Sequence, residues 1–508
     1  MIEPTSEREA GGTVKRRLRR AGRTQLAWKL IDVNAAVGEG HKARAIVDLV
    51  SRLDVSRFEE PIRSLEHGPG RSALDPALLI SLWIYGYSEG IGSGRELARR
   101  MEFEPALLWI LGDREAVCHS KLSEFRTGHG EALRDLFTQL LVLLESGGWV
   151  DLARVMQDGT KIQAQAGQDS FRRAHTIEQK LEQARGIVTE LEQQEEEGAK
   201  ESARQHAARQ RAARERAERL EEAWAEMQRL QAAAAGEGRD KVRVSVTEPE
   251  ARRMKHGNDG GIAPSYNLQL STDAQARIIV GAGLTQEAGD AHQLLPAVER
   301  IEEEWQRRPA QVIADGGYTT RANIVGMAAL EVDFVGSLGD VQARQAAALK
   351  SNGIGASYGP AAFVQIGEGR GSLQCPAGRV LGYVRRSRKR GLEYFQYQAD
   401  GKDCRSCPHQ GECCPKRAER GRTVSILQEL PEVVAFQEKM ETEEARQAYR
   451  QRGNVAEFPN AWLKEKIGLR KFRLRGMVKA GLEALWACFT YNAMQWGRLQ
   501  GQLRLAAV

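Results

Sequence analysis

The sequence predicts an α/β protein built on a mixed sheet with flanking helices, an all-α N-terminal domain and two insertions. Three observations predict this fold class. Short apolar strand patterns alternate with amphipathic helical patterns over residues 265–335. A polar stretch rich in Ala, Glu, Gln and Arg, residues 176–240, predicts a coiled-coil or helical-hairpin insertion. Five of the seven cysteines lie within residues 375–414, which predicts a Cys-rich insertion.

Composition and charge limit the classes of function. The chain has 508 residues, enough for several domains with cores of their own. Lys and Arg number 74 against 68 Asp and Glu, so the formal net charge is only +6 and nucleic-acid affinity must come from local basic patches. No apolar run reaches about 18 residues, and no apolar signal core follows the basic N-terminus. We expect a cytoplasmic protein with no membrane partner.

The composition shifts predict the domain boundaries. We expect a basic N-terminal arm that contacts phosphates or is merely solvated, then a helical DNA-binding domain, and then a catalytic domain interrupted by the two insertions. The predicted segments are 1–30 (arm), 31–147 (helical domain), 148–175 and 241–340 (catalytic domain), 176–240 (helical insertion), 341–430 (Cys-rich insertion) and 431–508 (C-terminal helices of the catalytic domain).

The N-terminal domain is predicted to be helical throughout. Asp75-Pro76 is a sound helix start before the apolar run Ala77–Trp83. The basic stretches Ser88–Met101 and His119–Arg126 read as short helices with exposed arginines. This arrangement suits a helix-turn-helix-like DNA-binding module, and a plain helical bundle is the alternative.

The helical insertion keeps a 4-3-4-3 apolar spacing along its first half. One long helix and an antiparallel helical hairpin both fit this spacing. Such a stripe is more often structural or dimerising than catalytic. Its apolar positions are Ile177, Leu181, Ala184, Val188 and Leu191.

Two predicted strands each deliver an aspartate at an end. The stretch Val150–Met156 reads as a partly buried strand, and Asp158-Gly159 after it is a turn signal. The short apolar strand Gln311–Ala314 likewise ends on Asp315, before two glycines. Either Asp-Gly pair alone is typical of an ordinary turn. The two aspartates indicate a metal site only if the chain supplies a third carboxylate.

A later helical segment supplies that carboxylate. Glu457 and Lys464 are seven residues apart, nearly two turns, so they point the same way if the segment is helical. Pro459 is tolerated only if Glu457 sits at or just before the first turn. The basic residues that follow suit contact with a phosphate backbone. They are Arg470, Lys471, Arg473 and Arg475.

Together, Asp158, Asp315 and Glu457 form an oxygen-only ligand set. Such ligands prefer Mg²⁺ or Mn²⁺, and two such ions can activate water or a 3′-hydroxyl and stabilise the leaving oxygen at phosphorus. The alternative is that they are three unrelated surface residues. The ordered set within this element pattern favours the metal site.

These motifs resemble those of the DDE transposases of bacterial insertion sequences, whose catalytic domain is similar to RNase H and retroviral integrase. The resemblance runs from about residue 70 to the C-terminus. Its motifs are Asp-Gly-Thr-Lys at Asp158, Pro-Ser-Tyr-Asn-Leu-Gln at 264–269, Ala-Asp-Gly-Gly-Tyr at 314–318, and a Tyr-Arg-Glu-Lys signature at Tyr449, Arg452, Glu457 and Lys464. One departure is Glu457-Phe458-Pro459, where many relatives have Pro or His directly after Glu.

The resemblance implies an RNase H-like sheet and a specific chemistry. Asp158, Asp315 and Glu457 would hold two Mg²⁺ (or Mn²⁺) ions that cleave the ends of the insertion sequence and join the 3′-hydroxyls to target DNA. Lys464 and Arg452 would hold the DNA backbone near the scissile phosphate, supported by Tyr449. The implied partners are double-stranded DNA (terminal inverted repeats and target) and a second copy in a homodimeric synaptic complex.

The clustered cysteines have the paired spacing of a tetrahedral zinc site. Cys375, Cys404 and Cys407 with one of Cys413 or Cys414, of which we favour Cys413, would give four ligands to a structural Zn²⁺. His409 is a substitute ligand, and reduced thiols packing a loop are the alternative. Four sulfurs could fold a Gly-rich insert that lacks much apolar core. Cys118 and Cys488 lie in helical segments, where we expect buried side chains.

Two other classes of protein remain as hypotheses. One is a non-catalytic DNA-binding or scaffolding protein derived from a transposase, against which the three intact carboxylates argue. The other is a metal-dependent nuclease of related fold without strand transfer, which would use the same metal site. His256 and His292 could approach the metal ions or the DNA, and we favour a structural or solvated role for both.

Overall fold

The computed structural model describes most of the chain, and the predicted N-terminal arm lies outside the described residues. None of the helices in this described part combines the length and apolar character needed to cross a membrane. The described residues are 32–64, 72–196, 203–234, 236, 238–257, 261–337, 347–367, 370–389, 392–416 and 418–501.

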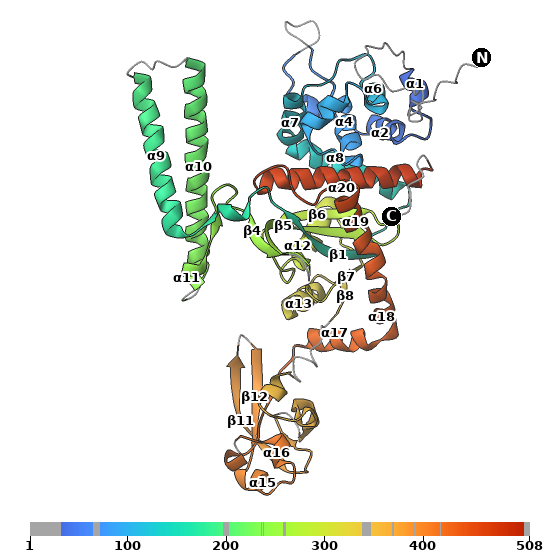
Figure 1. The fold of residues 1–508 in the computed structure, drawn as a ribbon. Coiled ribbons are helices and arrows are strands. Elements are labelled where there is room, and N and C mark those ends of the chain that lie inside the picture. The colour runs from blue at the N-terminus through green and yellow to red at the C-terminus, as the bar shows by residue number, and fades with distance from the viewer. Residues whose placement is uncertain are drawn as a thin grey trace, which may run out of the picture.

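A six-stranded mixed sheet forms the centre of the molecule (Figure 1). Its main path is β6-β5-β1-β7-β8, in which the first three strands are antiparallel and the last two run parallel to β1. This order and direction are those of an RNase H-like sheet, so the predicted fold class is confirmed. The strands are β1 (Arg154–Gln163), β4 (Arg252–Lys255, paired with the start of β5), β5 (Ile262–Asp273), β6 (Ile279–Thr285), β7 (Gln311–Ala314) and β8 (Asp333–Gly336).

Strand β1 differs from the predicted strand at both ends. It begins at Arg154 and continues to Gln163, so the prediction of a turn at Asp158-Gly159 is wrong. The reason is tertiary packing, because a Cβ at Gly159 would lie 2.5 Å from Oδ1 of Asp290 and 2.6 Å from Nε2 of Gln269. Gly159 therefore permits close approach of side chains to the middle of a strand.

Helices cover both faces of the sheet, and α20 is the most deeply buried of them. Its residues from 482 to 497 are nearly all buried, which shows that this stretch is enclosed by protein on all sides. Figure 1 shows α20 between the sheet and the N-terminal helices. The helices of this part are α12 (Leu294–Trp305), α13 (Arg321–Ala329), α17 (Pro431–Glu441), α18 (Glu443–Arg450), α19 (Arg452–Glu465) and α20 (Met477–Leu499).

The N-terminal part is helical, and its longest apolar helix starts where Asp75-Pro76 predicts. Oδ1 of Asp75 accepts a hydrogen bond from the backbone N of Ala77 at 2.8 Å and caps α4. Cys488 is buried in α20 as expected, but Cys118 is exposed because it precedes the first turn of α7. The helices are α1 (Val33–Ala36), α2 (Lys42–Ser51), α3 (Ser56–Glu59), α4 (Pro76–Ser88), α5 (Gly94–Arg100), α6 (Pro105–Leu111), α7 (His119–Gly128) and α8 (Gly130–Ser146).

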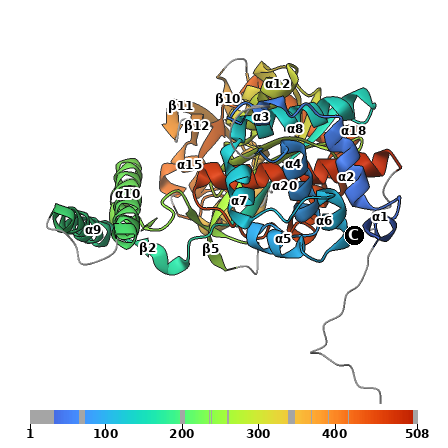
Figure 2. The same ribbon diagram turned by 90° about the horizontal axis from the view of Figure 1, so that it is seen from above.

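The helical insertion is an antiparallel hairpin of α9 (Ala174–Glu196) and α10 (Ala203–Ala233), one of the two predicted alternatives. Figures 1 and 2 show it projecting from one side of the molecule. Strands β2 (Phe171–Arg172) and β3 (Val244–Ser245) pair at its base, and α11 (Gly238–Lys241) precedes β3. The two helices pack through Ile177, Leu181, Ala184, Ala217, Leu220, Ala223 and Met227.

The Cys-rich insertion contains a five-stranded antiparallel sheet, in the order β13-β12-β11-β10-β9. It has a small apolar core that includes Phe363, Leu373, Leu381, Tyr397 and Val424. Its elements are β9 (Val364–Ile366), β10 (Ser372–Gln374), β11 (Val380–Lys389), β12 (Leu392–Ala399), β13 (Thr423–Leu427), α15 (Gly401–Arg405) and α16 (Gln410–Cys413).

A buried carboxylate, Glu248, joins three distant segments beside the sheet. It accepts hydrogen bonds from the backbone N of Ala166 at 2.9 Å, the hydroxyl of Tyr266 at 2.9 Å and the backbone N of Gly476 at 3.1 Å. Only 2% of the residue is exposed. Because these donors follow β1, lie in β5 and precede α20, Glu248 fixes the approach of α20 to the sheet.

We expect Glu248→Ala to lower the free energy of unfolding by about 3 kcal/mol, because it leaves three donors without their acceptor in a buried site. Glu248→Gln should cost less, since its amide retains one acceptor oxygen. Thermal and urea unfolding of the two variants and the wild-type chain would measure this. Equal stability of all three proteins would contradict the role of Glu248.

Candidate active site

The carboxylate of Asp158 lies in the middle of β1 and faces helix α19. Its Oδ2 accepts a hydrogen bond from Nδ2 of Asn460 at 2.7 Å, and its Oδ1 lies 3.9 Å from Nη1 of Arg452. Arg452 and Asn460 are eight residues apart in α19, so both project from one face of the helix. The Asp158 side chain is 18% exposed, which leaves an opening for a ligand. Asn460 is a site residue that no sequence motif indicated.

Asp315 lies beside Asp158 because of the parallel pairing of their strands. Gln157 of β1 pairs with Ala314 of β7, and the next residue on each strand is one of the two aspartates. Oδ1 of Asp315 accepts a hydrogen bond from the backbone N of Gly317 at 2.7 Å, which orients the half-buried carboxylate. Strand order alone thus brings together two of the three predicted carboxylates.

The two aspartates influence each other electrostatically. Burial is the largest cause that raises the pKa of Asp158 to about 6, and the negative charges of Asp315 and Asp290 raise it further. The positive charge of the Arg452 guanidinium lowers the pKa of Asp158 and so partly offsets these effects. Asp158 is therefore a carboxylate whose ionised form is disfavoured and would be stabilised by a cation.

A third aspartate, Asp290, lies close to this pair and was missed as a site residue. Its Oδ1 accepts hydrogen bonds from Nδ2 of Asn267 and Nε2 of Gln269, each at 2.8 Å. Oε1 of Gln269 accepts in turn from Nε2 of Gln157 at 2.9 Å. Asn267 and Gln269 are buried polar residues at alternate positions of an apolar strand, and this pattern is the signal that could have indicated the site.

The predicted third carboxylate, Glu457, is not brought to the aspartates. It is an exposed residue inside α19, and its carboxylate turns back toward Gly453. The expectation that Pro459 limits Glu457 to the helix start is wrong, because α19 begins at Arg452 and contains Pro459 in its interior. In the described residues, no three Asp, Glu, His or Cys side chains lie close enough together to hold a metal ion.

The other residues of the Tyr-Arg-Glu-Lys signature lie along α18 and α19. The guanidinium of Arg452 lies 5.9 Å from the ring centroid of Tyr449, which packs beside it. Lys464 is half-buried, and burial is the main cause that lowers its pKa, followed by the charge of Arg470. The negative charge of Asp158 raises the pKa of Lys464 and so partly offsets this lowering. Lys464 therefore lies within electrostatic range of Asp158.

The basic segment after α19 is tied back to β1. The backbone N of Gln163 donates to Arg470 O at 3.1 Å, and Phe472 N donates to Gln163 O at 2.8 Å. Lys471 and Arg475 are exposed, whereas the guanidinium of Arg473 lies over Gly92 of the N-terminal part. Arg470 forms an ion pair with Glu465.

The aspartate pair has features that fit a divalent cation. Its donors are oxygens, its two carboxylates repel each other, and the Oδ1 of Asn460 beside it is buried without a hydrogen-bond partner. A cation with oxygen ligands would relieve the repulsion and use the unpaired amide oxygen directly or through a bound water.

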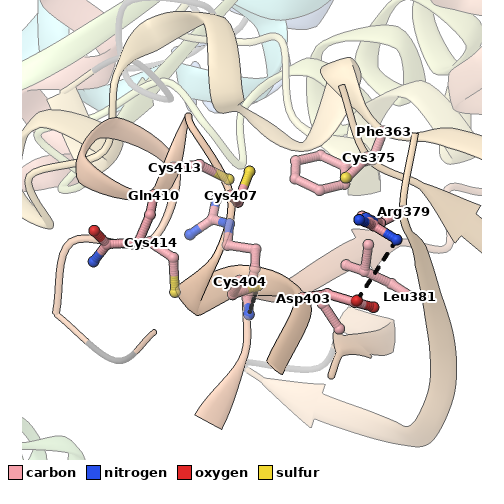
Figure 3. A pocket seen from close by; sticks show the side chains of 12 residues that line it. Phe363, Cys375, Arg379, Leu381, Asp403, Cys404, Cys407, Gln410, Cys413 and Cys414 are labelled. Atoms are coloured by element: carbon pink, nitrogen blue, oxygen red, sulfur yellow. Dashed lines mark hydrogen bonds and ion pairs between the residues drawn. The ribbon is translucent and has the colours of Figure 1, made fainter. Parts of the chain in front are cut away.

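The cysteines of the second insertion line one small cavity of about 30 Å³, enough for a single ion or water (Figure 3). Cys375 faces Cys407 and Cys413 across it. The lining cysteines are Cys375, Cys404, Cys407, Cys413 and Cys414.

The thiols line one cavity, but among the described residues they do not lie close enough together to hold a metal ion in this arrangement. The backbone N of Arg422 donates to Sγ of Cys404 at 3.3 Å, which favours a sulfur that carries negative charge. Burial raises the pKa of Cys413 to about 11, with smaller contributions from neighbouring cysteines. A cation would replace these protons, since thiolates are the ligands of zinc.

Two family models match the chain. Residues 32–128 match a transposase domain (DUF772), and residues 374–496 match a transposase DDE domain. The second match contains Glu457 and the cysteines, and it begins after both aspartates. No curated protein matches the chain.

Among solved structures, the chain is similar to the piggyBac transposase in a synaptic complex with hairpin DNA. The identity is 10%, the alignment covers 92% of this chain and 86% of that chain, and the TM-score is 0.26.

The sheet has an RNase H-like order, and it carries Asp158 and Asp315 side by side on the adjacent parallel strands β1 and β7. The matches to a transposase domain and to a transposase DDE domain confirm the predicted resemblance to DDE transposases. Enzymes of this family use divalent metal ions in general.

We expect Asp158→Asn to raise the free energy of unfolding at pH 7 by about 2 kcal/mol, because it removes a carboxylate whose ionisation is disfavoured in the folded chain. The folded pKa lies above the ordinary value, so the wild-type chain loses this stability as pH rises from about 4 to about 6. The gain should therefore vanish below pH 4, where the carboxyl is protonated in both states. Thermal unfolding at pH 3.5 and pH 7 would test this, and an equal gain at both would refute it.

Proposed function

We propose that this transposase binds the ends of its own insertion sequence, cleaves the DNA and joins the 3′-hydroxyl ends to target DNA. The observation that carries the proposal is the placement of Asp158 and Asp315 side by side on adjacent parallel strands. Two-metal chemistry at phosphorus uses such a paired oxygen site, in which the ions stabilise charge on both the attacking and the leaving oxygen.

Asp158, Asp315 and Glu457 would hold two Mg²⁺ or Mn²⁺ ions. When bound, such ions activate the attacking oxygen and stabilise the leaving oxygen in an in-line displacement. Glu457 lies three residues before Asn460 in α19, so the two are neighbours on the helix surface. The Glu457 side chain now turns toward Gly453, and a different rotamer of it would bring its carboxylate toward Asp158.

The residues around the pair have distinct roles in this proposal. Asn460 orients the Asp158 carboxylate through its hydrogen bond at 2.7 Å. Arg452 neutralises part of the negative charge of Asp158. Once metal ions neutralise that charge, the guanidinium would be available to bind a DNA phosphate. Tyr449 supports the guanidinium of Arg452 from the side. Lys464 and the exposed Lys471 would contact the DNA backbone.

The partners in this proposal are double-stranded DNA, as terminal inverted repeats and as target, and a second copy of the chain. Two ends must be held together for joining, so we propose a homodimer in the synaptic complex. A related nuclease that cleaves without strand transfer would use the same carboxylates. A scaffold protein would need none of them.

We expect Asp158→Asn, Asp315→Asn and Glu457→Gln each to reduce cleavage and joining by about a thousandfold or more with Mg²⁺ or Mn²⁺ present. The substrate is duplex DNA carrying the sequences that flank the gene, with supercoiled plasmid as target. Glu444→Gln, an exposed carboxylate of α18, is the matched control and should retain activity.

Each outcome of this assay separates the hypotheses. Cleavage without joined products would indicate the nuclease, and binding without cleavage would indicate the scaffold. Full activity of Asp158→Asn would show that the aspartate pair is not the active site.

We also propose that Cys375, Cys404, Cys407 and Cys413 hold a structural Zn²⁺ ion. The shared cavity and the hydrogen bond to Cys404 support this proposal. Cys414 also lines the cavity and is buried, so it is the alternative fourth ligand.

The purified chain should contain a single zinc ion, measured by elemental mass spectrometry. Cys404→Ser and Cys407→Ser should lower the zinc content and the unfolding temperature, because thiolate ligands contribute metal binding energy to folding. Comparison of Cys413→Ser with Cys414→Ser identifies the fourth ligand, and exposed Cys118→Ser is the control. A wild-type chain that lacks zinc after preparation in zinc-containing medium would contradict the proposal.

A further inference from the structure

The Cys-rich insertion holds a disproportionate share of the positive charge of the chain. Residues 341–430 contain 15 Lys and Arg against seven Asp and Glu, a net charge of +8, whereas the whole chain carries only +6. The run 385–390 alone supplies five of these basic residues. Neither the aspartate pair nor the cysteine cavity uses this charge. Such asymmetry between parts of one chain indicates a polyanionic partner for the basic part.

Three arginines of this run lie on β11 where that strand is an edge of the Cys-rich sheet. Strand β10 pairs with β11 only at Val380 and Leu381, so no described strand covers the outer edge of β11 beyond that point. Arg385, Arg386 and Arg388 follow on this edge, and all three are exposed. Because side chains alternate along a strand, Arg385 projects from one face and the other two project from the opposite face.

A fourth arginine, Arg370, joins this group from the segment before β10. Its guanidinium carbon lies 5.6 Å from the ring centroid of Tyr383 and 5.8 Å from that of Phe395. Phe395 pairs with Arg386 across β11 and β12, so both arginines lie on the same face of the sheet. The backbone O of Arg370 accepts a hydrogen bond from the hydroxyl of Tyr397 at 2.7 Å, which fixes the segment. A guanidinium stacked on aromatic rings keeps N–H groups at its edge for a phosphate.

The contacts that these arginines already make do not consume their capacity to bind an anion. Nε of Arg385 donates to Oε1 of Gln396 at 2.7 Å, and this bond leaves the Nη groups for another acceptor. Arg386 pairs with Glu393, and the two side chains are 56% and 38% exposed. An ion pair this exposed contributes little free energy, so a phosphate can take the place of Glu393. Glu393 is also the single acidic residue of β11 and β12.

We propose that Arg370, Arg385 and Arg386 form a phosphate-binding patch through which the Cys-rich part contacts duplex DNA. This inference rests on the proposed function and deepens it, because it assigns a second DNA contact apart from the aspartate pair. Guanidinium groups bind phosphate through paired N–H donors, and contacts of this kind do not depend on the DNA sequence.

The patch lies at the end of the Cys-rich sheet that adjoins the catalytic part. Figure 1 shows β11 and β12 extending from the end with α15 and α16 toward α13. Nε of Arg321 in α13 donates to Oε1 of Glu429 at 2.7 Å, and the backbone N of the preceding residue, Gln428, donates to Glu393 O at 2.9 Å. These contacts hold the arginine end of the sheet beside the helix that follows Asp315, which favours the DNA bound by the catalytic part as the occupant.

Protection of an edge strand is the other role that these arginines could have. Charged side chains on an exposed edge prevent pairing with the edge of another sheet, and this role needs no DNA. Two observations favour the DNA contact. Arg370 lies outside the edge strand yet is oriented toward the same face, and the charge of the run is all of one sign.

The test measures binding of the full chain to a short fluorescent duplex of arbitrary sequence by anisotropy, with EDTA present, over a range of salt concentrations. We expect Arg385→Gln/Arg386→Gln to weaken binding about 10-fold or more at low salt. The slope of log K against log salt should fall by about 2, because each lost phosphate contact lowers it by about 1. Arg370→Gln should lower the slope by about 1. Arg385→Lys/Arg386→Lys should keep the slope, since both charges remain.

Lys402→Gln/Arg405→Gln is the matched control. It removes two exposed charges from α15, at the other end of the Cys-rich part, and should bind like the wild-type chain. Thermal unfolding of each variant shows whether it is folded.

Wild-type affinity and salt slope in folded Arg385→Gln/Arg386→Gln would overturn the patch, and aggregation of that variant in light scattering would then assign the arginines to edge protection. Equal weakening by the α15 control would also overturn it, because the effect would come from net charge alone. The assay contains no divalent ion and needs no cleavage. It can therefore fail while the cleavage assay on Asp158→Asn, which tests the proposed function, succeeds.

Discussion

The pairing of β1 on both of its edges is the constraint on which the rest of the site depends. Its antiparallel pairing with β5 runs from Val155 to Gln163, and its parallel pairing with β7 runs from Arg154 to Gln157. A strand bonded on both sides cannot shift its register without exposing its apolar face. The position of Asp158 is therefore set by backbone hydrogen bonds, and Asp315 follows from it by strand order.

This fixed position places a carboxylate where its charge is unfavourable, and α19 compensates for part of that cost. Arg452 and Asn460 approach the two oxygens of Asp158 from one helix face. Glu457 projects from a neighbouring direction on the same helix and remains exposed. The helix thus stabilises Asp158 with hydrogen-bond and charge donors, whereas Glu457 stays away from it.

Much of the fold and the placement of two of the three predicted carboxylates could be predicted from the sequence, because periodicity and strand order are local or topological properties. The adjacency of Asp158 and Asp315 could be predicted because it follows from the order of the strands that carry them. The prediction of a turn at Asp158-Gly159 was wrong because Gly159 is required by tertiary packing. The side chains of Asp290 and Gln269, which are distant in the sequence, lie where its Cβ would be. The contact of Asn460 with Asp158 joins residues 302 positions apart, and no local pattern records it.

The two insertions leave the sheet intact because each one departs beyond the end of a strand and returns before the next element of the core. The hairpin lies between β2 and β3, and the Cys-rich sheet lies between β8 and α17. Two sets of hydrogen bonds link segments of the catalytic domain that the insertions separate in the sequence. Gln163 bonds to the segment after α19, and Glu248 bonds to the residues before α20. The basic segment around Lys471 is thereby held beside the end of the strand that carries Asp158.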